Sequence, residues 1–295
     1  MSVGLRGHPR GSLKYEWGGQ AMKRLESKVA VITGGGGGIG RAIAARLSGD
    51  GASVVVADID PSLGAAACKD VQQQGGSALF AQVDISDEAS VIAMFAAAKQ
   101  EFGGVDILVN NAYRSHPGDV DVESMQRDVW METMAINSLG PLLCCKHAIG
   151  HMKLRGGGVI INITSGASLA GQLSMPAYAA AKAATNMLTK SVATMHGRDR
   201  IRCNSIVPGM IWHPRLADTF SEEMRATYDE SLLLPYRGEP ADVAGTVAFL
   251  VSDDAKFITA QLIGVHGGLY DHHPNYATIR SKGKLIKQGV LIDAK

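Results

Sequence analysis

The stretch VAVITGGGGGIGR, residues 29–41, decides the fold. Its first five residues, Val29–Thr33, are mostly β-branched, which predicts a short buried strand. The glycines that follow predict a tight turn, and residues 41–47 continue with helical spacing of their apolar side chains. A strand, a glycine turn and a helix in this order form a site where the N–H groups of the helix can bind a pyrophosphate.

The same alternation of strand and helix continues to residue 268. Short β-branched runs alternate with Ala-rich stretches of helical periodicity, which is typical of βα units that build a parallel sheet. We therefore predict an α/β fold: a doubly wound Rossmann sheet of about seven parallel strands with helices on both faces, in a single domain spanning residues 22–268. The strand runs cover residues 29–33, 53–59, 77–85, 105–112, 158–165, 201–209 and 261–268.

Three segments do not follow this alternation. Residues 1–21 are polar and Gly-rich, and we expect a disordered leader there. Residues 210–238 mix aromatic, leucine and acidic residues, which favours a substrate lid, although an ordinary pair of surface helices fits the same pattern. Residues 269–295 form a C-terminal extension whose basic and apolar mixture fits either docking onto a neighbouring subunit or disorder.

Composition and charge exclude several classes of function. The formal net charge is +1 and charged residues are spread along the chain, so we expect no nucleic-acid partner. No segment has the apolar length of a signal peptide or a transmembrane helix, so we expect no membrane association. The four cysteines show no CxxC pair, which fits a reducing cytoplasm.

A carboxylate follows the glycine turn at the end of the second strand run. Asp58 lies about 20 residues after the turn, where a carboxylate accepts hydrogen bonds from an adenosine ribose and repels a 2′-phosphate. Ile59 and Gly37 are not the basic residues that would pair with that phosphate. This pattern favours NAD over NADP as cofactor, while the alternative for Asp58 is a cap on the next helix.

A tyrosine and a lysine stand four residues apart in the helix-forming segment 176–195. Tyr178 and Lys182 therefore share one face of the helix. We expect the Lys182 cation to lower the pKa of the Tyr178 phenol, and an oxidised nicotinamide to lower it further, so that Tyr178 serves as general acid/base. A YxxxK match alone is common by chance on solvated helix faces.

Taken together, these motifs make the sequence resemble the short-chain dehydrogenase/reductase family. The resemblance covers the chain from about Leu25 to Gly268. The motifs occur in the family's order, and their combination is specific. The matching residues are Thr33-Gly34, Gly38-Ile39-Gly40, Asp84-Ile85, Asn110-Asn111-Ala112, Asn137, Ser165, the pair Tyr178 and Lys182, and Pro208-Gly209.

The resemblance implies a role for each residue of the reaction centre. Tyr178 exchanges the proton of the substrate hydroxyl, Ser165 hydrogen-bonds the same oxygen, and Lys182 also holds the nicotinamide ribose. Asn137 is implied to keep a water beside Lys182 that leads protons to solvent. The alternatives are a strand-end cap for Ser165 and a helix-interior amide bonded to the backbone for Asn137.

The resemblance also implies the cofactor site. Asp84 and Ile85 belong to the adenine pocket, Asn111 and Ala112 brace the sheet beside the cofactor, and the backbone near Ile211 meets the nicotinamide carboxamide. The full predicted set of cofactor residues is Gly34, Gly38, Ile39, Gly40, Asp58, Asp84, Ile85, Asn111, Ala112, Tyr178, Lys182, Pro208, Gly209 and Ile211.

Three positions depart from the family pattern. Tyr113 replaces a glycine, His213 stands where threonine is frequent, and His266 replaces an aspartate. Tyr113, Trp212 and His213 are our candidate substrate residues, with the alternative that His213 belongs only to the lid. His272 and His273 do not complete a ligand set with His266, so we expect no metal.

These features predict an NAD-dependent oxidoreductase that interconverts a secondary alcohol, cyclic or otherwise apolar, and its ketone. Its partners would be a small-molecule alcohol or ketone and further copies of itself, because the family implies a tetramer or dimer. Two alternatives remain open: an oxoacyl-thioester reductase of the same family, and a non-catalytic NAD-binding scaffold. Asp58 disfavours the first, and the set Ser165, Tyr178 and Lys182 disfavours the second.

Overall fold

The computed structural model describes residues 24–213, 220–281, 284–287 and 290–293. The predicted leader, residues 1–21, and part of the predicted lid, residues 214–219, lie outside the described residues. Within the described part of the chain, no helix is long and apolar enough to cross a membrane.

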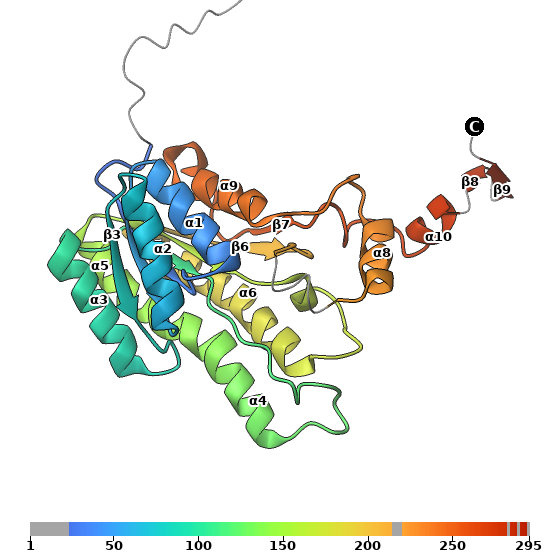
Figure 1. The fold of residues 1–295 in the computed structure, drawn as a ribbon, viewed down its shortest axis with the longest axis horizontal. Coiled ribbons are helices and arrows are strands. Elements are labelled where there is room, and N and C mark those ends of the chain that lie inside the picture. The colour runs from blue at the N-terminus through green and yellow to red at the C-terminus, as the bar shows by residue number, and fades with distance from the viewer. Residues whose placement is uncertain (1–23, 214–219, 282–283, 288–289, 294–295) are drawn as a thin grey trace, which may run out of the picture.

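One parallel sheet of seven strands forms the centre of the domain, which confirms the predicted fold class (Figure 1). The strand order is β3-β2-β1-β4-β5-β6-β7, and every neighbouring pair is parallel. The strands are β1 (Val29–Thr33), β2 (Ser53–Asp58), β3 (Ala78–Gln82), β4 (Ile107–Asn110), β5 (Gly158–Ile163), β6 (Ile201–Pro208) and β7 (Leu262–Val265).

Alternate side chains of each strand enter two separate cores. In β1, Ala30 and Ile32 pack on the side of α1, α2 and α9, whereas Val31 packs on the side of α3, α5 and α6. Continuous apolar strands are expected for a parallel sheet that is covered on both faces. The helices are α1 (Gly38–Gly49), α2 (Pro61–Gln73), α3 (Glu88–Phe102), α4 (Arg127–Met134), α5 (Gly140–Leu154), α6 (Pro176–His196), α8 (Glu222–Ser231), α9 (Pro240–Val251) and α10 (Tyr276–Ser281).

The strand order reverses between β1 and β4. The chain runs from β1 outward to β3, then returns to the other side of β1 with β4 and continues to β7. Loops that leave β1 and β4 therefore diverge, and a crevice opens at their carboxyl ends. This topology places the glycine turn after β1 beside the segment that follows β4.

A wide turn interrupts the helical stretch between residues 127 and 154. The structure divides it into α4, a π-helical turn (Ala135–Leu139) and α5. Pro141 has no N–H to donate to the carbonyl oxygen four residues earlier, that of Asn137. That oxygen instead accepts a hydrogen bond from the Thr185 hydroxyl of α6, at 3.0 Å.

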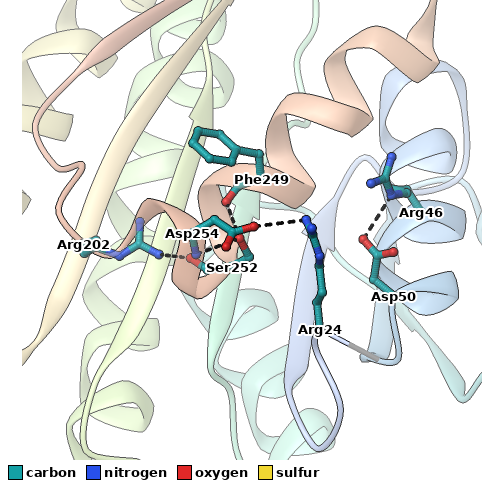
Figure 2. A network of polar contacts seen from close by, with 7 residues as sticks. All are labelled: Arg24, Arg46, Asp50, Arg202, Phe249, Ser252 and Asp254. Carbon is teal, nitrogen blue, oxygen red and sulfur yellow. Dashed lines mark hydrogen bonds and ion pairs between the residues drawn. The ribbon is translucent and has the colours of Figure 1, made fainter. Parts of the chain in front are cut away.

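Two arginines, Arg24 and Arg202, bind the segment that follows α9. Figure 2 shows Arg202 of β6 next to the segment that ends α9, where it donates to the carbonyls of Leu250 and Ser252. In the same view Arg24 pairs with Asp254 at 3.2 Å, with both side chains mostly exposed. Guanidinium groups at these carbonyls complete the hydrogen bonds that the helix end leaves open.

The segment after β7 leads away from the sheet along α8. The side chain of His272 hydrogen-bonds the Ser231 carbonyl, and Arg280 of α10 donates to the Leu232 carbonyl. In Figure 1, α10 and the hairpin of β8 (Lys284–Lys287) and β9 (Val290–Asp293) lie beyond α8, away from the sheet. The described part of the extension thus contacts the predicted lid of its own chain.

The buried carboxylate of Asp106 supports a prediction about stability. Its oxygens accept hydrogen bonds from the Val29 amide at 2.9 Å and from two nitrogens of Arg155 at 2.9 and 3.1 Å. Asp106→Ala leaves these donors unpaired at the start of β1, so we expect a loss of about 2–3 kcal/mol in the free energy of unfolding.

Urea denaturation monitored by circular dichroism measures this loss. Asp254→Ala, which removes the exposed ion pair with Arg24, is the control and should cost less than about 1 kcal/mol. Equal losses in the two variants would contradict the role assigned to Asp106.

Candidate active site

A cavity of about 740 Å³ lies at the carboxyl edge of the sheet. Segments that follow β1, β2, β3, β4, β5 and β6 line it, together with the first turns of α6. The predicted site residues fall along this cavity in two groups, one near the glycine turn and one near Tyr178.

The glycine turn brings the backbone of β1 against that of β4. Gly34 has a positive φ of 63°, and a Cβ there would lie 2.8 Å from the Cα of Ala112. A Cβ on Gly40 would lie 2.1 Å from the Gly34 carbonyl oxygen, so Gly40 packs beneath the turn and does not line the cavity. Gly34, Gly38 and Ile39 do line it. The turn and the start of α1 form a cradle that fits a phosphate group.

Asp58 lies at the end of β2 and holds the glycine turn. One carboxylate oxygen accepts a hydrogen bond from the Gly36 amide at 2.8 Å, and the other accepts from the Asp60 amide at 3.0 Å. The cap of α2 is Asp60, which accepts from Ser62 and Leu63, so Asp58 does not cap that helix. Asp58 lines the cavity beside Ile59, which is 63% exposed.

The segment after β3 forms the next part of the wall. Asp84 is exposed and accepts hydrogen bonds from both the amide and the hydroxyl of Ser86, at 2.9 and 2.6 Å. Ile85 is buried against Gly140, where an added Cβ would meet its side chain at 2.7 Å. Both residues line the cavity, on the same side of it as Asp58.

Asn111 ties the end of β4 to the glycine turn. Its amide nitrogen donates to the carbonyls of Thr33 and Gly34, each at 3.0 Å. The backbone amides of Asn111 and Ala112 both donate to the Thr33 hydroxyl, at 3.0 and 3.1 Å. These bonds hold the end of β4 against the glycine turn that follows β1.

Tyr178, Ser165 and Lys182 meet at the other end of the cavity. The Tyr178 hydroxyl interacts with the side chain of Ser165, which lies two residues after the end of β5, and both residues line the cavity. The Lys182 amine lies 5.7 Å from the centre of the Tyr178 ring and donates to the Ile163 carbonyl at 3.0 Å. All three residues line the cavity, and Tyr113 packs edge-on against Tyr178 with ring centres 6.3 Å apart.

Burial controls the protonation of this group. It raises the pKa of the Tyr178 phenol well above its usual value, and the hydrogen bond from Ser165 opposes that rise. Burial also lowers the pKa of Lys182 to about 8. We expected the neighbouring amine to lower the pKa of the Tyr178 phenol; in the protein alone this pKa is raised instead, because desolvation is the largest influence on it.

Asn137 lies in the π-helical turn, fully buried and outside the cavity lining. Its amide nitrogen donates to the carbonyls of Arg114 and Thr133 at 2.8 and 3.0 Å, and its oxygen accepts from the Arg114 amide at 3.3 Å. The Asn137 side chain thus bonds to the backbone, as in the alternative role given above for a helix-interior amide. A water beside Lys182 stays a prediction.

The end of β6 closes the cavity near the glycine turn. Pro208, Gly209 and Ile211 line it, and so does His213, whose ring lies 3.8 Å from the position of a Cβ on Gly38. Trp212 does not line the cavity. Its ring packs edge-on against Phe220 and lies 4.7 Å from the guanidinium of Arg237, so it contacts the predicted lid.

Comparisons with known proteins agree with this geometry. A family model described as enoyl-(acyl carrier protein) reductase matches residues 35–270. A probable short-chain type dehydrogenase/reductase of Bradyrhizobium diazoefficiens is 46% identical over 258 residues, which are 87% of this chain and 92% of the relative. The chain belongs to the short-chain dehydrogenase/reductase family.

Relatives with named substrates belong to the same family. A 7alpha-hydroxysteroid dehydrogenase of Bacteroides fragilis is 34% identical, with 86% of this chain and 98% of the relative covered. A cis-4-hydroxycyclohexanecarboxylate dehydrogenase of Sinomonas cyclohexanicum is 35% identical, with 82% and 96% covered. The solved structure of a 7alpha-hydroxysteroid dehydrogenase complexed with NADH and 7-oxo glycochenodeoxycholic acid superposes with a TM-score of 0.80, 34% identity and coverage of 84% and 96%.

The structure adds two residues that the family motifs did not indicate. Asp119, buried in the loop after β4, accepts hydrogen bonds from the first amides of α6. Tyr270 covers Gly166, the residue after Ser165, so closely that a Cβ on Gly166 would lie 2.0 Å from its ring. No sequence motif indicated either residue, because each contacts a residue that is far away in the chain.

The histidines do not gather into a metal site. Among the described residues, no group of three His, Cys, Asp or Glu side chains could hold a metal ion. His266 packs edge-on against Tyr270 and lies 3.6 Å from the Asp271 carboxylate. Its position links the end of β7 to Tyr270.

Lys182 gives the stability of the protein a defined dependence on pH. Its pKa is about 8 in the folded protein and 10.5 as its ordinary value, so the unfolded chain binds more protons between these limits. The free energy of unfolding of the wild type, relative to Lys182→Met, should therefore rise from pH 8 to 10.5, by roughly 3 kcal/mol.

Urea titrations of both proteins across this range measure the difference. Lys190→Met, on the exposed face of the same helix, is the control and should show no such rise. A wild-type curve parallel to that of Lys182→Met would contradict the pKa assigned to Lys182.

Proposed function

We propose that the protein is an NAD-dependent oxidoreductase that interconverts a secondary alcohol and its ketone. The observation that carries this proposal is the meeting of Tyr178, Ser165 and Lys182 in the cavity that begins at the glycine turn. The family membership and the alcohol dehydrogenases among its relatives support it.

Tyr178 acts on the hydroxyl proton of the substrate. Its phenol accepts this proton during oxidation and returns it during reduction. Ser165 donates a hydrogen bond to the same substrate oxygen and stabilises the charge that develops there. The Ser165 side chain is held in place before substrate binds, because it accepts a hydrogen bond from the Ala167 amide at 3.2 Å.

Lys182 supplies positive charge beside the phenol. Its amine is fixed by the Ile163 carbonyl and fully buried among side chains of the cavity wall. A cation near the Tyr178 ring stabilises the phenolate that oxidation requires. Because its pKa is about 8, this cation is present at neutral pH and is lost as the solution becomes more alkaline.

The residues of the cavity fit a nicotinamide dinucleotide. The glycine cradle can hold its pyrophosphate, Asp58 can accept hydrogen bonds from the adenosine ribose, and Asp84 and Ile85 border the adenine side. When bound, NAD supplies the acceptor for the hydride that leaves the alcohol carbon. Arg41 is paired with Asp70, so its charge is already neutralised by a neighbour.

The walls near Tyr178 favour a ring-shaped, largely apolar substrate. Tyr113 packs edge-on against Tyr178 from the loop after β4, and Tyr270 of the C-terminal extension covers Gly166, the residue after Ser165. Aromatic rings of this kind pack well against the flat faces of cyclic alcohols. The named relatives act on a hydroxysteroid and on a hydroxycyclohexanecarboxylate, which are also cyclic.

A reductase of acyl thioesters is the second candidate, because the matching family model is described as an acyl carrier protein reductase. The pairing of Arg41 with Asp70 and the carboxylate of Asp58 disfavour the NADP that we expect such a reductase to use. Turnover of a thioester in preference to every cyclic alcohol would favour this candidate.

Tyr178→Phe tests the chemistry of the site. The variant keeps the ring and its packing but has no proton to exchange, so kcat should fall by at least about 10²-fold, the lower end of what general acid/base groups contribute. The affinity for NADH, measured by fluorescence titration, should stay within twofold.

Oxidation of a panel of cyclic secondary alcohols, followed by absorbance of reduced nicotinamide, gives the rates. We expect the wild-type protein to reduce NAD with at least one of these alcohols. A variant that keeps the wild-type rate would overturn the role of Tyr178, and a silent wild type that binds no NADH would overturn the proposal.

Asp58→Asn tests the choice of cofactor. The asparagine oxygen can still accept from Gly36, but the negative charge that repels a 2′-phosphate is removed. We expect the ratio of kcat/KM for NAD to that for NADP to fall by roughly tenfold, the effect of losing one charge repulsion. A wild type that already prefers NADP would contradict the role of Asp58.

A further inference from the structure

The helix that carries Tyr178 begins without a cap of its own. Its first residue is Pro176, preceded by Met175, whose side chain offers no acceptor and whose backbone is left-handed at a φ of 62°. The amides of Ala177 and Tyr178 belong to the first turn, which has no partners within the helix. A buried helix start of this kind needs an acceptor from elsewhere in the fold.

Asp119 is that acceptor, 58 residues before Ala177 in the chain. One carboxylate oxygen accepts from the Ala177 amide at 3.0 Å, and the other accepts from the Tyr178 amide at 2.9 Å. Its backbone carbonyl also accepts from the Met175 amide at 3.0 Å. The side chain is 3% exposed, and a carboxylate at the positive end of a helix is electrostatically favoured.

The loop that holds Asp119 is itself fixed to the cavity wall. It starts at Ala112, which donates to Thr33, and Arg114 exchanges hydrogen bonds with Asn137 in both directions. His116 then forms a turn in which its ring accepts from the Gly118 amide and its carbonyl accepts from the Asp119 amide, both at 3.0 Å. This loop also carries Tyr113, whose ring packs against Tyr178.

The loop therefore reaches the same helix by two routes. Asp119 holds the first turn of α6 directly, and Asn137 accepts a hydrogen bond from Thr185, two turns further along. Both routes begin in the segment that follows β4 and lines the cavity between the glycine turn and Tyr178.

We propose that Asp119 is a positioning residue that sets the place of Tyr178 relative to Ser165 and to bound substrate. Ser165 stands at the end of β5, whereas Tyr178 stands on a helix that can slide or fray at its start. A displacement of about 1 Å in a reacting group can lower a rate roughly 10²-fold. Loss of the two hydrogen bonds to Asp119 could therefore lower kcat by moving Tyr178 only slightly. This inference rests on the proposed function.

The experiment compares Asp119→Ala and Asp119→Asn with Asp87→Ala. Asp87 also caps a helix, accepting from the Ala89 amide at 3.1 Å, but it is exposed and local to α3, which carries none of the reacting groups. For each protein we would measure kcat and KM for a cyclic alcohol, the NADH dissociation constant, the melting temperature, and hydrogen exchange of peptides that begin α6.

We expect Asp119→Ala to lower kcat by at least about tenfold, with NADH affinity within twofold and faster exchange at the start of α6. Asp119→Asn keeps one acceptor and should fall between Asp119→Ala and the wild type. Asp87→Ala should keep its kcat and lower the melting temperature by less than Asp119→Ala, because it removes a single exposed hydrogen bond. A lower kcat with unchanged NADH affinity and faster exchange at the start of α6 would show that Asp119 positions Tyr178 and does not merely stabilise the whole protein.

Two results would overturn the inference: a kcat of Asp119→Ala that matches Asp87→Ala, or exchange at the start of α6 that does not change. Should Asp119→Ala fail to fold, Asp119→Asn carries the same comparison. A wild type that oxidises no alcohol would remove the proposed function, while the exchange measurement would still decide whether Asp119 holds the start of α6.

Discussion

Hydrogen bonds between buried side chains hold the carboxyl edge of the sheet, and every group of the site stands on this edge. Asn111 fastens β4 to the glycine turn after β1. One residue earlier, Asn110 donates to Asn162 of β5, which donates to Thr189 of α6. Such bonds are strong in a low-dielectric interior and costly to leave unmade. They keep the strand ends at the fixed spacing that a shared ligand requires.

Helix α6 joins this edge to the chemistry of the cavity. Its first turn carries Tyr178 and its second carries Lys182. Further along, Thr185 donates to the Asn137 carbonyl, and Thr189 accepts a hydrogen bond from Asn162 of β5. Burial moves the pKa of the Tyr178 phenol up from its ordinary value of 10 and that of the Lys182 amine down from 10.5 to about 8, so the two values move apart. Burial thus favours the neutral form of both groups and opposes the phenolate that oxidation requires.

Local patterns in the sequence predicted most of the fold and part of the site. The β-branched runs and the glycine turn specify the strands directly, and the four-residue spacing places Tyr178 and Lys182 on one face. Contacts between distant segments were not predictable in this way. Asp119 has no local motif, Trp212 points to the lid instead of the cavity, and the pKa of Tyr178 depends on burial that spacing does not reveal. The leader, the lid, the oligomeric state and the cytoplasmic location stay predictions.

The packing of Tyr270 on Gly166 makes the C-terminal extension part of the architecture around Ser165. The tyrosine ring occupies the room that any side chain at position 166 would need. These two positions can therefore be exchanged only as a pair: a larger residue at 166 calls for a smaller one at 270. Anyone who redesigns this protein has to vary them jointly, and shortening the chain before Tyr270 would remove the ring that packs against the residue after Ser165.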